Sequence, residues 1–290
     1  MNNKVVGIGE ALWDCLPGGK QIGGAPANFA FHVAQAGFPV CAVSAVGCDT
    51  LGDELISNFT NVGLPFLLPR VPFPTGTVQV TVDAEGKPAY EIKEGAAWDN
   101  IPWNAEMEQL ASETIAVCFG SLAQRSEVSC YTIRRFIQTV AAKEGSLVVF
   151  DVNLRQHFFN REVVEESLRL SNILKLNDEE LPVVCRLLDI ADNCTETCCK
   201  TLLDAYHLKA LILTCGTNGS YIFADNDESF YPTPKVTVVD TVGAGDSFTG
   251  TFIASLLKGK TIADAHALAV KVSAYVCTQK GAMPPHTADM

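Results

Sequence analysis

The sequence lacks three features, each of which would point to a particular partner or compartment. It has no run of basic residues that could follow a phosphate backbone, and 21 Lys and Arg against 33 Asp and Glu give a net charge of −12. No apolar run approaches the roughly 20 residues that a membrane helix needs. Glu10 and Asp14 come too early for the apolar segment of a signal peptide. We therefore expect a soluble, cytoplasmic protein that binds neither nucleic acid nor membranes.

The eleven cysteines lack the even number and regular spacing of a disulfide framework. Several lie inside apolar runs, as buried thiols do: Cys41, Cys118, Cys215 and Cys277. Cys194 and Cys198 are one helical turn apart and Cys199 follows, but no CxxC or histidine pair accompanies them. A metal site there is the less favoured interpretation.

Two common nucleotide-binding motifs are also missing. GxxxxGK[ST] occurs nowhere, so the usual phosphate-binding loop is absent. The segment "GIGEAL" offers Gly7 and Gly9 after an apolar run, but Leu12 stands where a dinucleotide fingerprint has its third glycine. A nicotinamide oxidoreductase is therefore a weak alternative.

Short apolar runs alternate with longer amphipathic ones along the chain. We expect strands at 5–12, 41–46, 115–119, 147–150, 173–176 and 211–214, and helices at 26–35, 127–143, 162–170 and 197–207. This alternation predicts an α/β fold with a mostly parallel sheet covered on both faces. The sequence shows no repeat, low-complexity tract or linker, so we expect residues 1–290 to form a single domain.

The segment 75–93, "TGTVQVTVDAEGKPAYEIK", breaks this alternation with two strand-like runs around a turn-rich stretch at 83–88. We interpret it as a hairpin outside the main sheet. Together with the strand-like residues after Glu10, it would form a small β lid from about 11–22 and 75–95. The alternative is an antiparallel edge added to the main sheet.

The stretch "DTVGAGDSF" at 240–248 carries the strongest signal for chemistry. We expect a strand at 236–239, then a glycine turn, then a helix from Asp246. The first amides of such a helix are unpaired and bind anions, and Gly243 and Gly245 let a phosphate approach the backbone. From this stretch alone Asp246 is equally well a helix cap or a catalytic base that deprotonates a hydroxyl beside the phosphate.

A second glycine turn, "LTCGTNGS", follows an expected strand. Thr214, Gly216 and Gly219 could hold nucleotide phosphates there. A hairpin turn into a strand at 220–224 is an equally good interpretation of the same residues.

Two groups of polar residues suit a ligand with hydroxyl groups. In "IGGAPANF", Gly23 and Gly24 leave space beside the backbone, and Asn28 supplies a donor and an acceptor. Asp14, just past the first strand, is a further acceptor. Taken singly, an exposed Asn28 and an ordinary loop acid at Asp14 are simpler interpretations.

Mid-chain strands end in polar residues, where open α/β sheets bind ligands. Asp151, Asn153 and Arg155 end one strand in "FDVNLR", and "LKLNDEEL" brings Asn177 and Glu180 three residues apart on an expected helical face. Such oxygen donors suit Mg²⁺, directly or through water. The alternative for Glu180 is an ordinary surface acid.

Four separated motifs, in this order, resemble the ribokinase-like (PfkB) family of carbohydrate kinases over nearly the whole chain. They are GGxxxN at 23–28, NxxE at 177–180, TxGxxG at 214–219 and DTxGAGD at 240–246. The resemblance implies a three-layer sandwich with a β lid at 75–93. It also implies an ATP-dependent phosphotransferase acting on a primary sugar hydroxyl.

The resemblance assigns roles to individual residues. Asp246 would be the base, Gly243, Ala244 and Gly245 the anion hole, and Arg155 a phosphate contact. The sugar would lie on Asp14, Gly23, Gly24 and Asn28, and ATP on Asn177, Thr214, Gly216 and Gly219. Asn177 and Glu180 would organise Mg²⁺ through water, and Asp240, Val242 and Gly281 would hold a monovalent cation such as K⁺.

The segments "GGAPANFA" and "DVNLRQHFF" look most like fructokinases, which makes fructose the expected substrate. Ribokinase, 2-keto-3-deoxygluconate kinase and a catalytically silent sugar-binding regulator remain alternatives. Trp98 departs from the smaller residue common in related sequences, and the sugar would be in doubt if Trp98 lined the pocket. Lids of this family often pair, so we expect a homodimer. The five histidines form no cluster, and we assign them no role.

Overall fold

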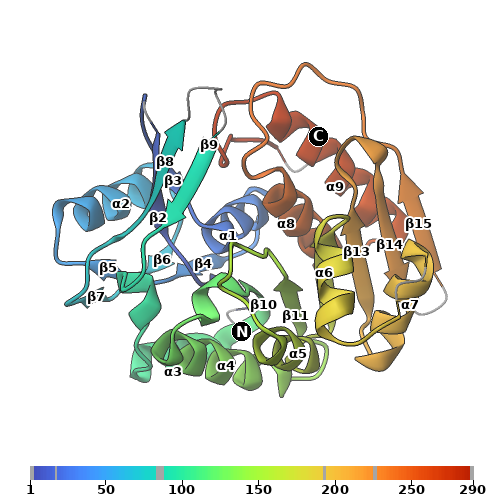
Figure 1. Cartoon of the computed structure of the whole chain (residues 1–290), viewed down its shortest axis with the longest axis horizontal. Coiled ribbons are helices and arrows are strands. Elements are labelled where there is room, and N and C mark those ends of the chain that lie inside the picture. The colour runs from blue at the N-terminus through green and yellow to red at the C-terminus, as the bar shows by residue number, and fades with distance from the viewer. Residues whose placement is uncertain (1–2, 17, 83–87, 192–193, 225–226, 288–290) are drawn as a thin grey trace.

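A nine-stranded sheet forms the centre of the molecule in the computed structural model (Figure 1). The structure describes residues 3–16, 18–82, 88–191, 194–224 and 227–287. The strand order is β15-β14-β13-β12-β11-β10-β1-β4-β6, and all neighbours are parallel except at β14 and β15. The strands are β1 (Lys4–Ile8), β4 (Val40–Val43), β6 (Phe66–Leu67), β10 (Thr114–Gly120), β11 (Leu147–Asp151), β12 (Ile173–Asn177), β13 (Ala210–Thr214), β14 (Ser220–Ala224) and β15 (Asp227–Tyr231).

Helices cover both faces of this sheet, which confirms the predicted three layers. One apolar core includes side chains of α1 (Ala25–Gln35), α2 (Thr50–Asn61), α8 (Ala244–Leu257) and α9 (Ile262–Cys277). The other includes side chains of α3 (Ala105–Glu113), α4 (Glu127–Ala141), α5 (Arg161–Leu170), α6 (Glu180–Leu187) and α7 (Thr195–Ala205). Strand residues divide between the two: Ala116 and Cys118 belong to the first core, Val117 and Phe119 to the second. Among the described residues, no helix has the length and apolar character needed to cross a bilayer.

A separate four-stranded sheet lies beside the central one (Figure 1). Its order is β3-β2-β8-β9, and none of its strands belongs to the main sheet: β2 (Leu12–Leu16), β3 (Gly19–Gly23), β8 (Gly76–Val82) and β9 (Pro88–Ile92). Of the predicted turn at 83–88, residues 83–87 lie outside the described residues, and Pro88 begins β9. A two-stranded sheet of β5 (Val46–Gly47) and β7 (Arg70–Val71) completes the β structure of the described residues.

Three of the expected strands are wrong. The strand expected at 41–46 divides into β4 of the main sheet and β5 of the two-stranded sheet. Residues 5–12 do not form one strand, because the chain turns at Gly9, with φ 154°, and passes from β1 in the main sheet to β2 in the second sheet. Residues 236–239 form no strand. Their amides at Val239 and Asp240 both donate to the carbonyl oxygen of Cys277 at the end of α9, and β15 already takes the adjacent edge of the sheet. This valine-rich segment is exposed instead, with Val238 58% and Val239 62% exposed.

Close packing of α1 on β1 brings the start of this helix to the carboxyl edge of the sheet. A Cβ atom at Gly7 would lie only 1.9 Å from the carbonyl oxygen of Pro26, so a larger residue would push the helix away. Glu10, Asp151 and Asn177 leave the sheet at this same edge, since parallel strands all end there. The start of α8 lies beside α1, so motifs far apart in the sequence converge here (Figure 1).

Candidate active site

Asp246 lies in the first turn of α8, at the centre of this convergence. The helix begins at Ala244 with Gly243 as its N-cap, so Asp246 is not the capping residue. Gly243 has φ 77°, and a Cβ atom there would lie 2.7 Å from Cα of Ala282. Both facts require glycine. The Ala244 amide already donates to the Thr241 carbonyl at 3.3 Å, which leaves the amides of Gly245 and Asp246 at the positive end of the helix for an anion.

The Asp246 carboxylate accepts a hydrogen bond of 2.7 Å from Nδ2 of Asn28, a residue predicted to bind the sugar. Burial raises the pKa of Asp246 to about 6, with a further rise from the nearby charge of Asp151. Asn28, Lys175 and Arg155 act in the opposite direction. Asp246 is therefore a proton acceptor of moderate basicity near neutral pH, which suits a general base.

Lys175 and Asp151 form a buried ion pair beside the α8 turn, with 2.9 Å between Nζ and Oδ1. A Cβ atom at Gly245 would lie 3.2 Å from this Nζ, so the ammonium group is next to the expected anion hole. Burial lowers the pKa of Lys175, but Asp151 and Glu180 outweigh it and raise the pKa above its usual value. Lys175 was not among the predicted site residues, although a lysine within the apolar strand "ILKLN" is a signal that could have found it.

The predicted sugar residues come together between the second sheet and α1. Cβ atoms built at the two glycines would meet their neighbours closely: 2.6 Å from Asp14 Oδ2 at Gly23, and 2.4 Å from the Glu10 carbonyl at Gly24. Gly24 also has φ 125°, which favours glycine. Burial raises the pKa of Asp14 above its usual range, and Arg155 opposes this rise. Gly23 thus lies against Asp14, and Asn28, four residues after Gly24, contacts Asp246.

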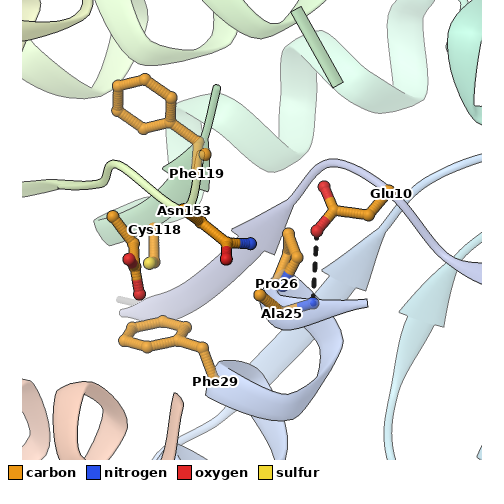
Figure 2. Close-up of a pocket in the computed structure, with 9 residues that line it drawn as sticks. Glu10, Ala25, Pro26, Phe29, Cys118, Phe119 and Asn153 are labelled. Atoms are coloured by element: carbon orange, nitrogen blue, oxygen red, sulfur yellow. Dashed lines mark hydrogen bonds between the residues drawn. The ribbon is translucent and has the colours of Figure 1, made fainter. Parts of the chain in front are cut away.

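A cavity of about 10 Å³ lies at the carboxyl ends of β10 and β11, and Glu10 lines it together with Asp151 and Asn153 (Figure 2). Its volume suits one water molecule, not a sugar. Glu10 Oε1 accepts the Ala25 amide at 3.3 Å, while Oε2 is buried with no hydrogen-bond partner among the described residues. Burial raises the pKa of Glu10 to about 7. Glu10 was not predicted as a site residue, and its role in holding the start of α1 depends on the fold.

Asn177 and Glu180 contact each other, but not on one helical face as expected. Asn177 ends β12, and its Oδ1 accepts the amides of Glu179 and Glu180 at 2.9 and 2.8 Å. The Glu180 carboxylate accepts the Asn177 amide through Oε2 and the Leu154 amide through Oε1, both at 2.9 Å. Glu180 is buried, so it joins the ends of β11 and β12 and is not a surface acid.

The loop with Thr214, Gly216 and Gly219 is the tight connection between β13 and the antiparallel β14. Thr214 is the register partner of Asn177, and its carbonyl accepts the Asp178 amide at 3.0 Å. The loop is therefore a hairpin turn, and it also adjoins the Asn177 segment. Both interpretations of this loop remain compatible with the structure.

Asp240 links the α8 turn to the segment after α9. Its Oδ1 accepts the Val242 amide at 3.0 Å, and its Oδ2 accepts the Gly281 amide at 3.1 Å. The fold thus brings together the three residues expected at a monovalent-cation site.

Two other expectations can be compared with the structure. Trp98 is fully buried under Gly76, with the Arg125 guanidinium 4.0 Å from its ring centroid, so it belongs to the core and does not face an open pocket. Cys194 is exposed whereas Cys199 is buried, and no group of three potential ligands suited to a metal occurs among the described residues.

Comparisons with known proteins identify the family and the fold. The family model described as pfkB family carbohydrate kinase matches residues 14–289. A fructokinase from Klebsiella pneumoniae is 28% identical over 302 residues, covering 98% of this chain and 96% of the relative.

Two solved structures share the fold. A fructokinase with bound ATP from Xylella fastidiosa has a TM-score of 0.85 at 22% identity, with 99% and 96% of the two chains covered. A fructokinase from Vibrio cholerae O395 in fructose, ADP and calcium ion bound form has a TM-score of 0.80 at 23% identity, with 97% and 95% covered.

The chain therefore belongs to the pfkB family of carbohydrate kinases. It is a phosphotransferase with an alcohol group as acceptor.

Proposed function

We propose that this protein is an ATP-dependent fructokinase that transfers the γ-phosphate to a primary hydroxyl of fructose. The observation that carries the proposal is the 2.7 Å hydrogen bond between Asn28 and Asp246 at the start of α8. This bond places Asn28, which suits sugar hydroxyls, in contact with a base, Asp246, in the anion-binding first turn of α8. The names of the relatives support fructose as the acceptor.

On the acceptor side, Asp14 and Asn28 hold sugar hydroxyls and orient the primary hydroxyl toward Asp246. Asp246 takes the hydroxyl proton as the oxygen attacks the γ-phosphorus. The new oxygen–phosphorus bond forms as the bond to the β–γ bridging oxygen breaks, and ADP leaves with that electron pair.

On the phosphate side, the charge of the transferring group is balanced by groups already in place. The amides of Gly245 and Asp246 face the phosphoryl oxygens at the positive end of α8. Lys175 is fixed near Gly245 by its ion pair with Asp151. Arg155 follows β11 at the same edge and is exposed, so it can move onto the phosphates when ATP binds.

The nucleotide lies along the segment that leads to the α8 turn. Thr233 ties this segment to the hairpin loop, since its Oγ1 accepts the Gly219 amide at 3.1 Å and donates to the Gly216 carbonyl at 2.5 Å. Val238 and Val239 are exposed between that loop and Gly243 and offer an apolar surface for the purine.

Mg²⁺ would reach the site with ATP, where it would neutralise phosphate charge. Asn177 and Glu180 are oxygen donors of the kind Mg²⁺ prefers, but every Glu180 oxygen already accepts an amide. They therefore fit contact through water. Both Asp240 carboxylate oxygens already accept amides, from Val242 and Gly281, so these residues would hold K⁺ through main-chain oxygens near the turn.

The second sheet serves as a lid over the sugar, because Asp14 and Gly23 belong to its strands β2 and β3. Closure would exclude water, which otherwise competes for the phosphoryl group. Its outer strands β3 and β9 leave edges that a second copy can pair with, so we propose a homodimer through this sheet. Light scattering coupled to size exclusion should give twice the monomer mass.

An ATP-using enzyme with buried cysteines such as Cys41 and Cys118 suits the cytoplasm. This assignment is part of the proposal.

The decisive experiment is a panel of acceptors assayed by ADP release with and without Mg²⁺. Fructose, ribose, 2-keto-3-deoxygluconate and fructose 6-phosphate are compared by kcat/KM, with water alone as the blank. Fructose should exceed the others by at least about ten-fold. Preference for another acceptor would replace fructose, and binding without turnover of any sugar would support a silent regulator instead.

A further inference from the structure

Two histidines that are 254 residues apart in the sequence meet behind the proposed site. His32 lies in α1, one turn after Asn28, and is fully buried. His286 lies in the segment that follows α9. Nδ1 of His32 and Nε2 of His286 are 3.0 Å apart, and the two rings stack with centroids 5.2 Å apart. The expectation that the histidines form no cluster is wrong for this pair.

The hydrogen-bond partners determine where the protons lie. Nε2 of His32 is 2.9 Å from the carbonyl oxygen of Ala282, which only accepts, so this nitrogen carries the hydrogen. In the neutral ring Nδ1 of His32 is then the acceptor, and His286 must donate from Nε2. Burial lowers the pKa of His32 to about 4 and that of His286 below its usual value, so both rings are neutral near pH 7. A directed chain of donors therefore runs from His286 through His32 to Ala282.

Ala282 connects this chain to the α8 turn. Its Cα and Cβ atoms lie 2.7 Å from where a Cβ atom of Gly243 would be, so the two residues are in close contact. The preceding amide, of Gly281, donates to Asp240. On the other side, Asn28 lies one turn before His32 in the same helix and holds Asp246. One rigid helix thus reaches both the turn and the base.

We propose that His32 and His286 are positioning residues for phosphoryl transfer. By holding Ala282 against Gly243, the pair fixes the amides of the α8 turn relative to Asp246 and the sugar held by Asn28. The inference rests on the proposed function, because it takes that turn and that carboxylate as the reacting groups.

Two substitutions of His286 separate positioning from simple packing. His286→Phe keeps an aromatic ring but cannot donate to His32, whereas His286→Gln keeps an N–H donor. The Phe variant should lose about ten-fold in kcat, because small displacements of reacting groups are costly, and its KM values should change less than about two-fold. The Gln variant should recover kcat to within about two-fold of the wild type. His207→Asn, on an exposed turn with φ 52°, is the control and should change neither constant.

A purely structural role predicts a lower melting temperature in the Phe variant with unchanged kcat well below that temperature. That result, or equal loss of kcat in the Phe and Gln variants, would overturn the proposal.

Imidazole ¹⁵N NMR of the resting protein tests the donor chain without an activity assay. Nε2–H tautomers for both His32 and His286 support it, and an Nδ1–H tautomer at His32 overturns it. If no sugar is phosphorylated but both tautomers are found, then the proposed function has failed while the His32–His286 link itself stands.

Discussion

Replacing Asp246 by Asn should greatly lower kcat while making the protein more stable. The substitution keeps an oxygen that can accept the hydrogen bond from Asn28 but removes the charge and the basicity. Loss of general-base catalysis should lower kcat by about 10²- to 10⁴-fold. ATP affinity should change little, since the amides and Lys175 remain in place.

The stability change follows from the pKa of Asp246. A rise from 3.8 to about 6 means that ionising this carboxyl costs roughly 3 kcal/mol more in the folded than in the unfolded chain. Asp246 keeps some contact with solvent, which reduces the expected gain to about 1–2 kcal/mol, or about 2–6 °C in melting temperature.

The size of this stability gain changes with pH in a defined window. The folded form binds the proton more tightly, so the wild type loses stability as pH rises from about 4 to about 6. The advantage of Asp246→Asn should therefore be complete above pH 6 and vanish near pH 4. Scanning fluorimetry across this pH range measures the melting temperature, calorimetric titration measures ATP affinity, and ADP-release kinetics measure kcat. A variant with near-normal kcat, or a melting-temperature gain that is the same at pH 4 and pH 7.5, would refute the reasoning.

Three further substitutions test other parts of the site. Asn28→Ala removes a donor that lowers the pKa of Asp246, so the acid limb of the kcat/KM profile should move to higher pH. The sugar KM should also rise about ten-fold. An acid limb that does not move would contradict the proposed effect of Asn28 on Asp246. Lys175→Met leaves Asp151 buried and unpaired, which should cost about 3–5 kcal/mol in urea denaturation. Adding Asp151→Asn should restore stability but not kcat, and recovery of both would remove Lys175 from the phosphate site. Gly243→Ala should cost about 1–3 kcal/mol and most of kcat, because of its φ of 77° and its contact with Ala282. Gly259→Ala is its matched control, because Gly259 has a φ of 76° and a Cβ atom built there would meet no atom within 4 Å. This variant should lose some stability but no activity.

Local sequence patterns were sufficient for several helices and strands and for the choice of candidate residues such as Asp246 and Asn28. The 3.6-residue period placed α1 and α4, and short apolar runs placed β10 to β13, because both sides of a covered parallel sheet must be apolar. Glycines around Asp246 and at Gly23 and Gly24 mark positions where the backbone needs positive φ or close approach. Each of these signals is local, so it can be recognised without knowing the fold.

The errors arose where a segment's structure depends on distant partners. The valines at 236–239 have the pattern of a strand, but β15 already occupies the sheet edge beside β14. Residues 5–12 read as one apolar run, although the chain passes between two sheets at Gly9.

The sequence by itself determined the fold class, the family resemblance and the choice of Asp246, Asn28 and the glycines around them as candidate site residues. Only the tertiary structure decided which side chains face one another: Asn28 and Asp246, Lys175 and Gly245, His32 and His286. The physical reason is the distance along the chain over which each kind of interaction acts. Propensity and periodicity act over a few neighbouring residues, whereas pKa values, ion pairs and proton positions depend on contacts between segments that are up to 254 residues apart in the chain.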